Sequence, residues 1–241
     1  MATFEHGDAT IHYEEHGSGY PVLLIAPGGM RSSIGVWANA PWNPVEQLST
    51  EFRVIAMDQR NAGLSTAPVS GSDGWHTYTA DQLRLLDHLG IDRCHVAGMC
   101  IGGSYILGLL EAAPERFTAA VLFQPIGFDD NRAAFLEMFD AWADELRPGH
   151  PEATEDDWAS FRRTMYGGDF TFNSSREFVR GCQTPMLVLK GADVYHPTST
   201  SLEIAELAPN ATLIDDWKEG PARDAARAAV AEFLMKHTPA E

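Results

Sequence analysis

Continuous apolar runs that alternate with helical patterns constrain the fold of this 241-residue chain more than any other feature. Such runs are typical of strands covered on both faces, and strands separated by helices pair in parallel through right-handed crossovers. Two polar-apolar segments, 3–10 and 11–17, precede them and predict a hairpin that turns near Gly7 and Asp8. We therefore expect an α/β fold with a doubly wound, mostly parallel sheet. The apolar runs are 21–29, 52–58, 94–99, 119–124, 185–191 and 211–215.

Helical patterns fill most of the intervals between these runs. Asn43 and Pro44 are typical of an N-cap and first turn, and they predict a short helix directly after them. Leucines at helical spacing predict a second helix that stops at Gly90. A third follows the run at 94–99 and ends at Pro114, and an alanine-rich helix closes the chain.

One long segment, 126–184, contains no convincing strand. It is crowded with aromatic side chains and predicts helices, one of them with Thr154 as N-cap and Asp157 three residues on. We expect 1–125 and 185–241 to form the α/β core and 126–184 to form a helical cap over one edge of the sheet. A packed excursion with no pocket beneath it is the alternative.

Composition excludes several functional classes. A formal net charge of −17 repels phosphates, so neither nucleic acid nor an anionic membrane is expected as a partner. No run reaches the roughly 18 apolar residues of a membrane span, and the N-terminus lacks the pattern of a secretory signal. Three cysteines make an odd number, which fits a reducing cytoplasm better than a disulfide framework. None of them has the spacing of a zinc site, and we expect neither a metal nor another cofactor. Oligomeric state stays open, with a homodimer as one option.

The stretch 95–103, HVAGMCIGG, predicts a buried strand that enters a tight turn and then a helix. A residue at the tip of such a turn has a strained backbone and needs neighbours without bulk, which Gly98 and Gly102 supply. The Cys100 side chain then projects over the carboxyl ends of the strands, where doubly wound sheets bind ligands. Helix dipoles there can lower a thiol pKa below its free value of ~8.5. Cys100 is thus a candidate nucleophile, with a small structural cysteine as the alternative.

Taken in their order along the chain, these segments resemble the α/β-hydrolase superfamily over nearly the whole sequence. Gly98-Met99-Cys100-Ile101-Gly102 is similar to its nucleophile elbow, and 21–29 to its strand and oxyanion loop. Residues 54–65 look like its Asp-x-Arg-x-x-Gly-x-Ser segment, and 184–193 like the strand that carries the acid. The cysteine elbow resembles that of dienelactone hydrolases, whereas the other motifs look closer to the capped esterase and iminopeptidase-like branch.

The resemblance implies a set of site residues. The backbone amide of Ile101 should supply one oxyanion donor, and the loop at Gly29 or Met30 should supply the other. Asp193 is implied as the acid of a triad. His76, which precedes a helix on the pocket side, and Trp142, in the aromatic cap, are candidates for substrate contact.

The sequence departs from the family at the histidine. The family places it after the last strand, but residues 213–226 contain none. His196 instead lies three residues after Asp193, in the loop that leaves the acid strand at the same sheet edge as Cys100. It could form a dyad with Cys100, oriented by Asp193, if the pair lies within roughly 3 to 4 Å. A purely structural His196 is the alternative.

The leading hypothesis is a cysteine-dependent hydrolase that acts on a small, largely apolar ester, thioester or lactone. Cys100 would form an acyl-enzyme, and His196 would activate water to release it. Two alternatives stay open on the same scaffold. The missing histidine motivates a small-molecule binding protein that has lost hydrolysis, and a non-hydrolytic lyase is the other.

Overall fold

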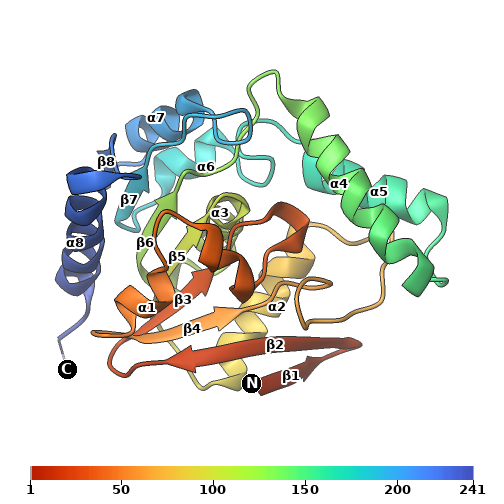
Figure 1. The fold of residues 1–241 in the computed structure, drawn as a ribbon, viewed down its shortest axis with the longest axis horizontal. Coiled ribbons are helices and arrows are strands. Elements are labelled where there is room, and N and C mark those ends of the chain that lie inside the picture. The colour runs from red at the N-terminus through yellow and green to blue at the C-terminus, as the bar shows by residue number, and fades with distance from the viewer. Residues whose placement is uncertain (1, 241) are drawn as a thin grey trace.

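The computed structural model describes residues 2–240, which are built around an eight-stranded sheet of order β1-β2-β4-β3-β5-β6-β7-β8 (Figure 1). The hairpin of β1 and β2 pairs antiparallel and joins β4 antiparallel, whereas the remaining neighbours are parallel. This confirms the predicted hairpin and the mostly parallel sheet. The strands are β1 (Ala2–His6), β2 (Ala9–His16), β3 (Pro21–Ile25), β4 (Arg53–Met57), β5 (Cys94–Met99), β6 (Phe117–Phe123), β7 (Met186–Leu189) and β8 (Ala211–Ile214).

Helices cover both faces of the sheet because successive strand residues point to opposite sides. In β3, Leu23 and Ile25 join the core beneath α2 and α3, while Val22 and Leu24 join the core beneath α1 and α8. All four side chains are fully buried. This doubly covered sheet explains why its strands are continuous apolar runs. The helices are α1 (Pro44–Leu48), α2 (Trp75–His88), α3 (Ile101–Ala112), α7 (Thr198–Leu207) and α8 (Gly220–His237).

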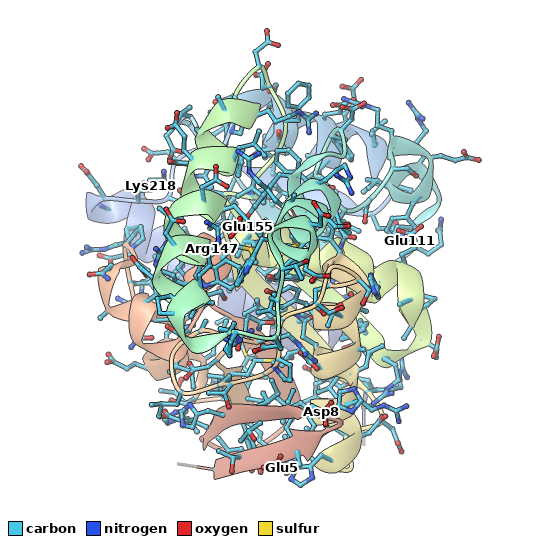
Figure 2. The ribbon with its side chains drawn as sticks, turned by 90° about the vertical axis from the view of Figure 1, so that its right-hand side faces the viewer. Glu5, Asp8, Glu111, Arg147, Glu155 and Lys218 are labelled. Carbon is cyan, nitrogen blue, oxygen red and sulfur yellow. The ribbon has the colours of Figure 1, made fainter. Side chains whose placement is uncertain are left out.

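Between β6 and β7 the chain leaves the sheet and forms α4 (Arg132–Leu146), α5 (Glu155–Tyr166) and α6 (Arg176–Gly181), with no strand among residues 126–184. Figure 1 shows α4 and α5 beyond one end of the sheet, and Figure 2 looks onto both helices. Arg147 and Glu155, labelled there, form a 3.4 Å surface ion pair between the end of α4 and the start of α5. We keep the name cap for 126–184.

The predicted N-terminus of α5 is confirmed. Thr154 Oγ1 accepts the backbone N–H of Asp157 at 3.2 Å, and the Asp157 carboxylate accepts the N–H of Thr154 at 2.9 Å. Each side chain therefore satisfies a backbone donor that the first helical turn leaves without a partner.

The loop after β3 is held by the end of β4. Asp58 Oδ1 accepts the Ile34 N–H at 2.7 Å, and its other oxygen accepts the Leu64 N–H at 2.8 Å and faces His12 Nδ1 at 3.0 Å. The Asp58 side chain is almost fully buried, so these donors compensate the cost of removing its charge from water. The carboxylate thereby fixes two loops at the carboxyl edge of the sheet.

Candidate active site

Cys100 is the tip of a sharp turn between β5 and α3. Its backbone has φ 61° and ψ −118°, a region that non-glycine residues rarely adopt. The turn brings main chains together: a Cβ on Gly98 would lie 3.1 Å from the Gly102 Cα, and a Cβ on Gly102 would lie 2.9 Å from the Ile25 carbonyl oxygen. Glycine is therefore required on both sides of Cys100, as the sequence predicts.

A cavity of about 300 Å³ lies over the sulfur. Loops after β3, β6 and β7 form its base together with the elbow, while α4 and α5 close it from above. None of the described lining residues is an aspartate, glutamate, lysine or arginine. The cap thus covers a pocket of mainly apolar character, lined by Gly28, Gly29, Cys100, Ile101, Ile126, Phe135, Met138, Tyr166, Tyr195 and His196.

A larger hollow of about 910 Å³ lies at the opposite, amino-terminal edge of the sheet, where it is lined by Phe117 and Pro185 at the starts of two strands. Its one cysteine is Cys182, whose thiol pKa is raised by burial. Because a raised pKa keeps a thiol protonated and unreactive, the smaller cavity is the better candidate for chemistry.

His196 faces the same cavity as Cys100 and is fixed by Asp193. Its Nδ1 lies 2.7 and 2.8 Å from the two carboxylate oxygens, and the backbone N–H of His196 also donates to Asp193 Oδ1 at 3.1 Å. The imidazole is largely buried. Its Nε2 meets no atom of residues 2–240 in strict hydrogen-bond geometry. This nitrogen is thus free to exchange a proton with a group in the cavity.

The pKa values of Cys100 and His196 are coupled. Burial by itself raises the pKa of the Cys100 thiol, but its interaction with the nearby His196 imidazole, together with the backbone groups of Gly28 and Ile101, outweighs burial and lowers it. Burial lowers the pKa of His196, but Cys100 and Asp193 outweigh that effect and raise it. Both shifts favour a thiolate beside an imidazolium.

Cys94 provides the contrast. It is fully buried in β5, and burial raises the pKa of its thiol to about 12. Of the three cysteines in the sequence, Cys100 alone has a lowered pKa, because only there do a basic side chain and backbone groups outweigh the effect of burial.

The loop that carries the imidazole is clamped on several sides. Ser201 Oγ accepts the Gly191 N–H at 3.0 Å, and Thr198 Oγ1 donates to the Gly191 carbonyl at 2.9 Å. Asn131, at the N-terminus of α4, donates from Nδ2 to the Val194 carbonyl at 2.6 Å. The cap therefore helps to hold the loop in the conformation that places the imidazole in the cavity.

Backbone amides reach the sulfur from two segments. These are the amides of Ile101 and Gly28. Contacts to the sulfur differ from contacts to a substrate oxyanion, so Ile101 with Gly29 or Met30 stays the prediction for the oxyanion donors. Gly29 borders the cavity, whereas Met30 is buried outside its lining. Gly28 and Gly29 have φ of 119° and 59°, so the main chain makes a left-handed turn here that glycine adopts without strain. The Gly-Gly pair was the sequence signal for such a turn.

Trp217 lies in the loop after β8, the loop in which the family carries its histidine. Its Nε1 donates to the Lys190 carbonyl at 2.8 Å, and its ring packs edge-on against Trp42 with centroids 5.5 Å apart. Figure 1 shows β8 and α8 on the side of the sheet away from α4 and α5. The loop after β8 therefore contributes a side chain to core packing.

The two expected substrate contacts lie elsewhere. Trp142 is buried within the cap, where it packs against Trp158 and Phe161 and donates from Nε1 to the Asn61 carbonyl at 3.3 Å. His76 is exposed in the first turn of α2. Neither residue borders the cavity. The structure corrects both expectations, because one side chain faces the interior of the cap and the other faces solvent.

Within residues 2–240, no group of three or more His, Cys, Asp and Glu side chains is placed to hold a metal ion. In the same residues, no helix has the length and apolar character needed to cross a membrane.

A nucleophile elbow at the carboxyl edge of a parallel sheet, beneath a helical cap, defines a class of enzyme scaffold. Over residues 21–211 the sequence matches the family described as alpha/beta hydrolase fold. The chain belongs to that family.

Curated relatives are similar over part of their length. The protein named as carbamate hydrolase RutD of Azorhizobium caulinodans is 38% identical over 110 residues, which cover 46% of this chain and 39% of that protein. Carboxylesterase YbfK of Bacillus subtilis is 32% identical over 109 residues, which cover 44% of this chain and 34% of that protein. The matches therefore span less than half of each relative.

Solved structures are similar over nearly the whole chain. The enol-lactonase from Burkholderia xenovorans superimposes with a TM-score of 0.72 and 22% identity, covering 97% of this chain and 100% of that one. The meta-cleavage product hydrolase CumD from Pseudomonas fluorescens gives a TM-score of 0.74 at 22% identity, covering 99% and 98%. At this identity the likeness establishes the fold.

Proposed function

We propose that this protein is a hydrolase that cleaves a small carboxylic ester, thioester or lactone through an acyl-thioester on Cys100. The observation that carries the proposal is the His196 imidazole, held by Asp193 at 2.7 Å and facing the cavity of Cys100. It supplies the base that the loop after β8 lacks. The curated relative named as a carboxylesterase adds support, and the solved structure named as an enol-lactonase shares the fold.

The first half of the reaction forms the acyl-enzyme. The Cys100 thiolate attacks the substrate carbonyl carbon, and the new C–S bond moves the carbonyl electron pair onto oxygen. Backbone N–H groups from Ile101 and the Gly28–Gly29 turn donate to this oxyanion, a contribution that is typically worth about 3 to 4 kcal/mol per donor. The oxyanion then collapses, the bond to the leaving group breaks, and His196 Nε2 delivers its proton to that group.

The second half returns the enzyme to its starting state. Water gives a proton to His196 Nε2 as its oxygen attacks the thioester carbonyl. Collapse of the second oxyanion breaks the C–S bond, releases the carboxylic acid and regenerates the thiolate. Asp193 keeps the imidazole oriented in both halves by accepting the Nδ1–H.

Activity measured on p-nitrophenyl acetate, a thioester and a small lactone tests the proposal, with Cys94→Ala as a matched control for Cys100→Ala. We expect Cys100→Ala to lose turnover and Cys94→Ala to keep it, because Cys94 lies in the core away from the cavity. Mass spectrometry of the quenched reaction should find the acetyl group on Cys100. Full turnover by Cys100→Ala would contradict the proposal.

The same samples address the alternatives. A binding protein would show no turnover with any of the three substrates. A lyase would release an unsaturated product without taking up oxygen from ¹⁸O-labelled water, whereas hydrolysis places that label in the carboxylic acid.

A further inference from the structure

Tyr166 presents a hydroxyl group that has no partner within residues 2–240, although its side chain is fully buried and lines the cavity of Cys100. A buried hydroxyl without a hydrogen bond costs about 1 to 3 kcal/mol, so native structures rarely retain one without a reason. A group of this kind that borders a cavity is satisfied when an acceptor enters that cavity.

The ring that carries this hydroxyl is held on several sides. Its centroid lies 5.3 Å from that of Phe135, 5.5 Å from that of Phe172 and 6.4 Å from that of Trp75. The Arg132 guanidinium donates to the backbone carbonyl of Tyr166, which fixes the last turn of α5. The aromatic neighbours offer no acceptor, and they leave the hydroxyl little freedom to turn elsewhere.

Charge in the cavity restricts what can meet this hydroxyl. Burial, with the nearby Cys100 thiolate and Tyr78, raises the pKa of the Tyr166 phenol well above its usual value, so it remains a neutral donor. Apart from the His196 imidazole, which is coupled to the thiolate, no described lining residue carries a positive charge. A substrate carboxylate would therefore lose its water without gaining a counter-ion.

We propose that the Tyr166 hydroxyl is a specificity determinant that donates a hydrogen bond to an uncharged oxygen of the substrate beyond the reacting carbonyl. The cavity thereby selects neutral, oxygen-bearing esters or lactones over esters that carry a carboxylate. This inference rests on the proposed function and adds the substrate class to it.

Tyr78 provides a matched control. Its hydroxyl is also buried and lacks a partner among the described residues, but it does not line the cavity. Loss of an unsatisfied buried hydroxyl is thus common to Tyr78→Phe and Tyr166→Phe, while loss of a donor to the substrate is confined to Tyr166→Phe.

Two pairs of p-nitrophenyl esters isolate the hydrogen bond, because each pair differs by one ether oxygen in place of a methylene. The pairs are methoxyacetate with butanoate, and 3-methoxypropanoate with pentanoate. In Tyr166→Phe we expect kcat/KM to fall on the order of tenfold for at least one ether ester, and by less than about twofold for its alkyl partner. Tyr78→Phe should change both members of each pair by the same factor. The wild type should hydrolyse p-nitrophenyl hemisuccinate at least about tenfold less efficiently than the pentanoate.

An equal loss on ether and alkyl esters in Tyr166→Phe would overturn the inference, because it would mean that the hydroxyl acts on the thiolate or on the fold. Hemisuccinate turned over as well as pentanoate would overturn the exclusion of carboxylates. If the wild type hydrolyses none of these esters and also leaves the thioester and the lactone intact, the proposed function itself fails. Protection of the Cys100 thiol from N-ethylmaleimide by δ-valerolactam, a neutral amide, then tests the donor without turnover. We expect about tenfold weaker protection in Tyr166→Phe, and unchanged protection would overturn the inference.

Discussion

Asp193→Asn is the substitution that probes the candidate site most selectively. Asp193 contacts the imidazole Nδ1 with both oxygens, at 2.7 and 2.8 Å, and its Oδ1 also accepts the backbone N–H of Tyr195 at 3.0 Å. Asparagine keeps an oxygen for the backbone donor, so the loop should remain folded. The change removes the negative charge and places an amide N–H donor against a ring that itself donates.

The magnitude follows from these contacts. A hydrogen bond to a charged group contributes about 1.5 to 3 kcal/mol, which corresponds to roughly 10- to 100-fold in rate. The Asp193 side chain is 46% exposed, so water screens the interaction and favours the lower part of that range. We expect kcat/KM for a small ester to fall about 10- to 30-fold.

The pH dependence of the same variant has a predicted sign. Asp193 helps to raise the pKa of His196, and the imidazolium in turn helps to lower the pKa of the Cys100 thiol. Asp193→Asn should therefore lower the first pKa and raise the second. Steady-state kinetics and iodoacetamide alkylation, each measured from pH 5 to about 10, read out both effects. Kinetics within twofold of wild type, with an unchanged alkylation profile, would refute the assignment of Asp193.

Three further predictions concern stability and are measured by urea unfolding. Burial and the nearby His237 lower the pKa of His95 from 6.5 to about 4, so the unfolded chain binds the proton first and stability falls as pH drops from 6.5 to 4. Over that pH range, the free energy of unfolding of His95→Gln should fall by about 3 kcal/mol less than that of the wild type. Parallel curves of unfolding free energy against pH would contradict this. Thr154→Ala removes one half of the capping box and should lower the free energy of unfolding by about 1 kcal/mol. An unchanged free energy would mean that the N-terminus of α5 is frayed. Gly102→Ala forces a Cβ to 2.9 Å from the Ile25 carbonyl oxygen and should lower the free energy of unfolding by at least about 2 kcal/mol. An unchanged free energy would show that the elbow relaxes.

The fold could be predicted from the sequence because its determinants are local. A strand covered on both faces must be apolar throughout, so β5 and β6 were visible as runs without any knowledge of their neighbours. The elbow was equally visible, since Gly98 and Gly102 answer a steric demand that extends only a few residues. The spacing of Asp193 and His196 was likewise a local signal.

Features set by tertiary contact could not be predicted in this way. His76 was expected to precede a helix, but α2 already begins at Trp75, whose indole donates to the Met165 carbonyl in the cap. Cavity residues such as Met138 and Tyr195 depend on how α4 and the loop after β7 meet above the sheet. Nothing in a single aromatic-rich helix distinguishes the side chain that faces the substrate from the one that faces the next helix.

Alkylation of Cys100 by iodoacetamide as a function of pH, compared between wild type and His196→Gln, tests the thiolate–imidazolium pair most directly. The wild-type rate should rise with an inflection below the free-thiol value of ~8.5, and His196→Gln should move that inflection upward. A wild-type thiol that titrates like a free cysteine, or an inflection that His196→Gln leaves in place, would contradict the pairing of Cys100 with His196.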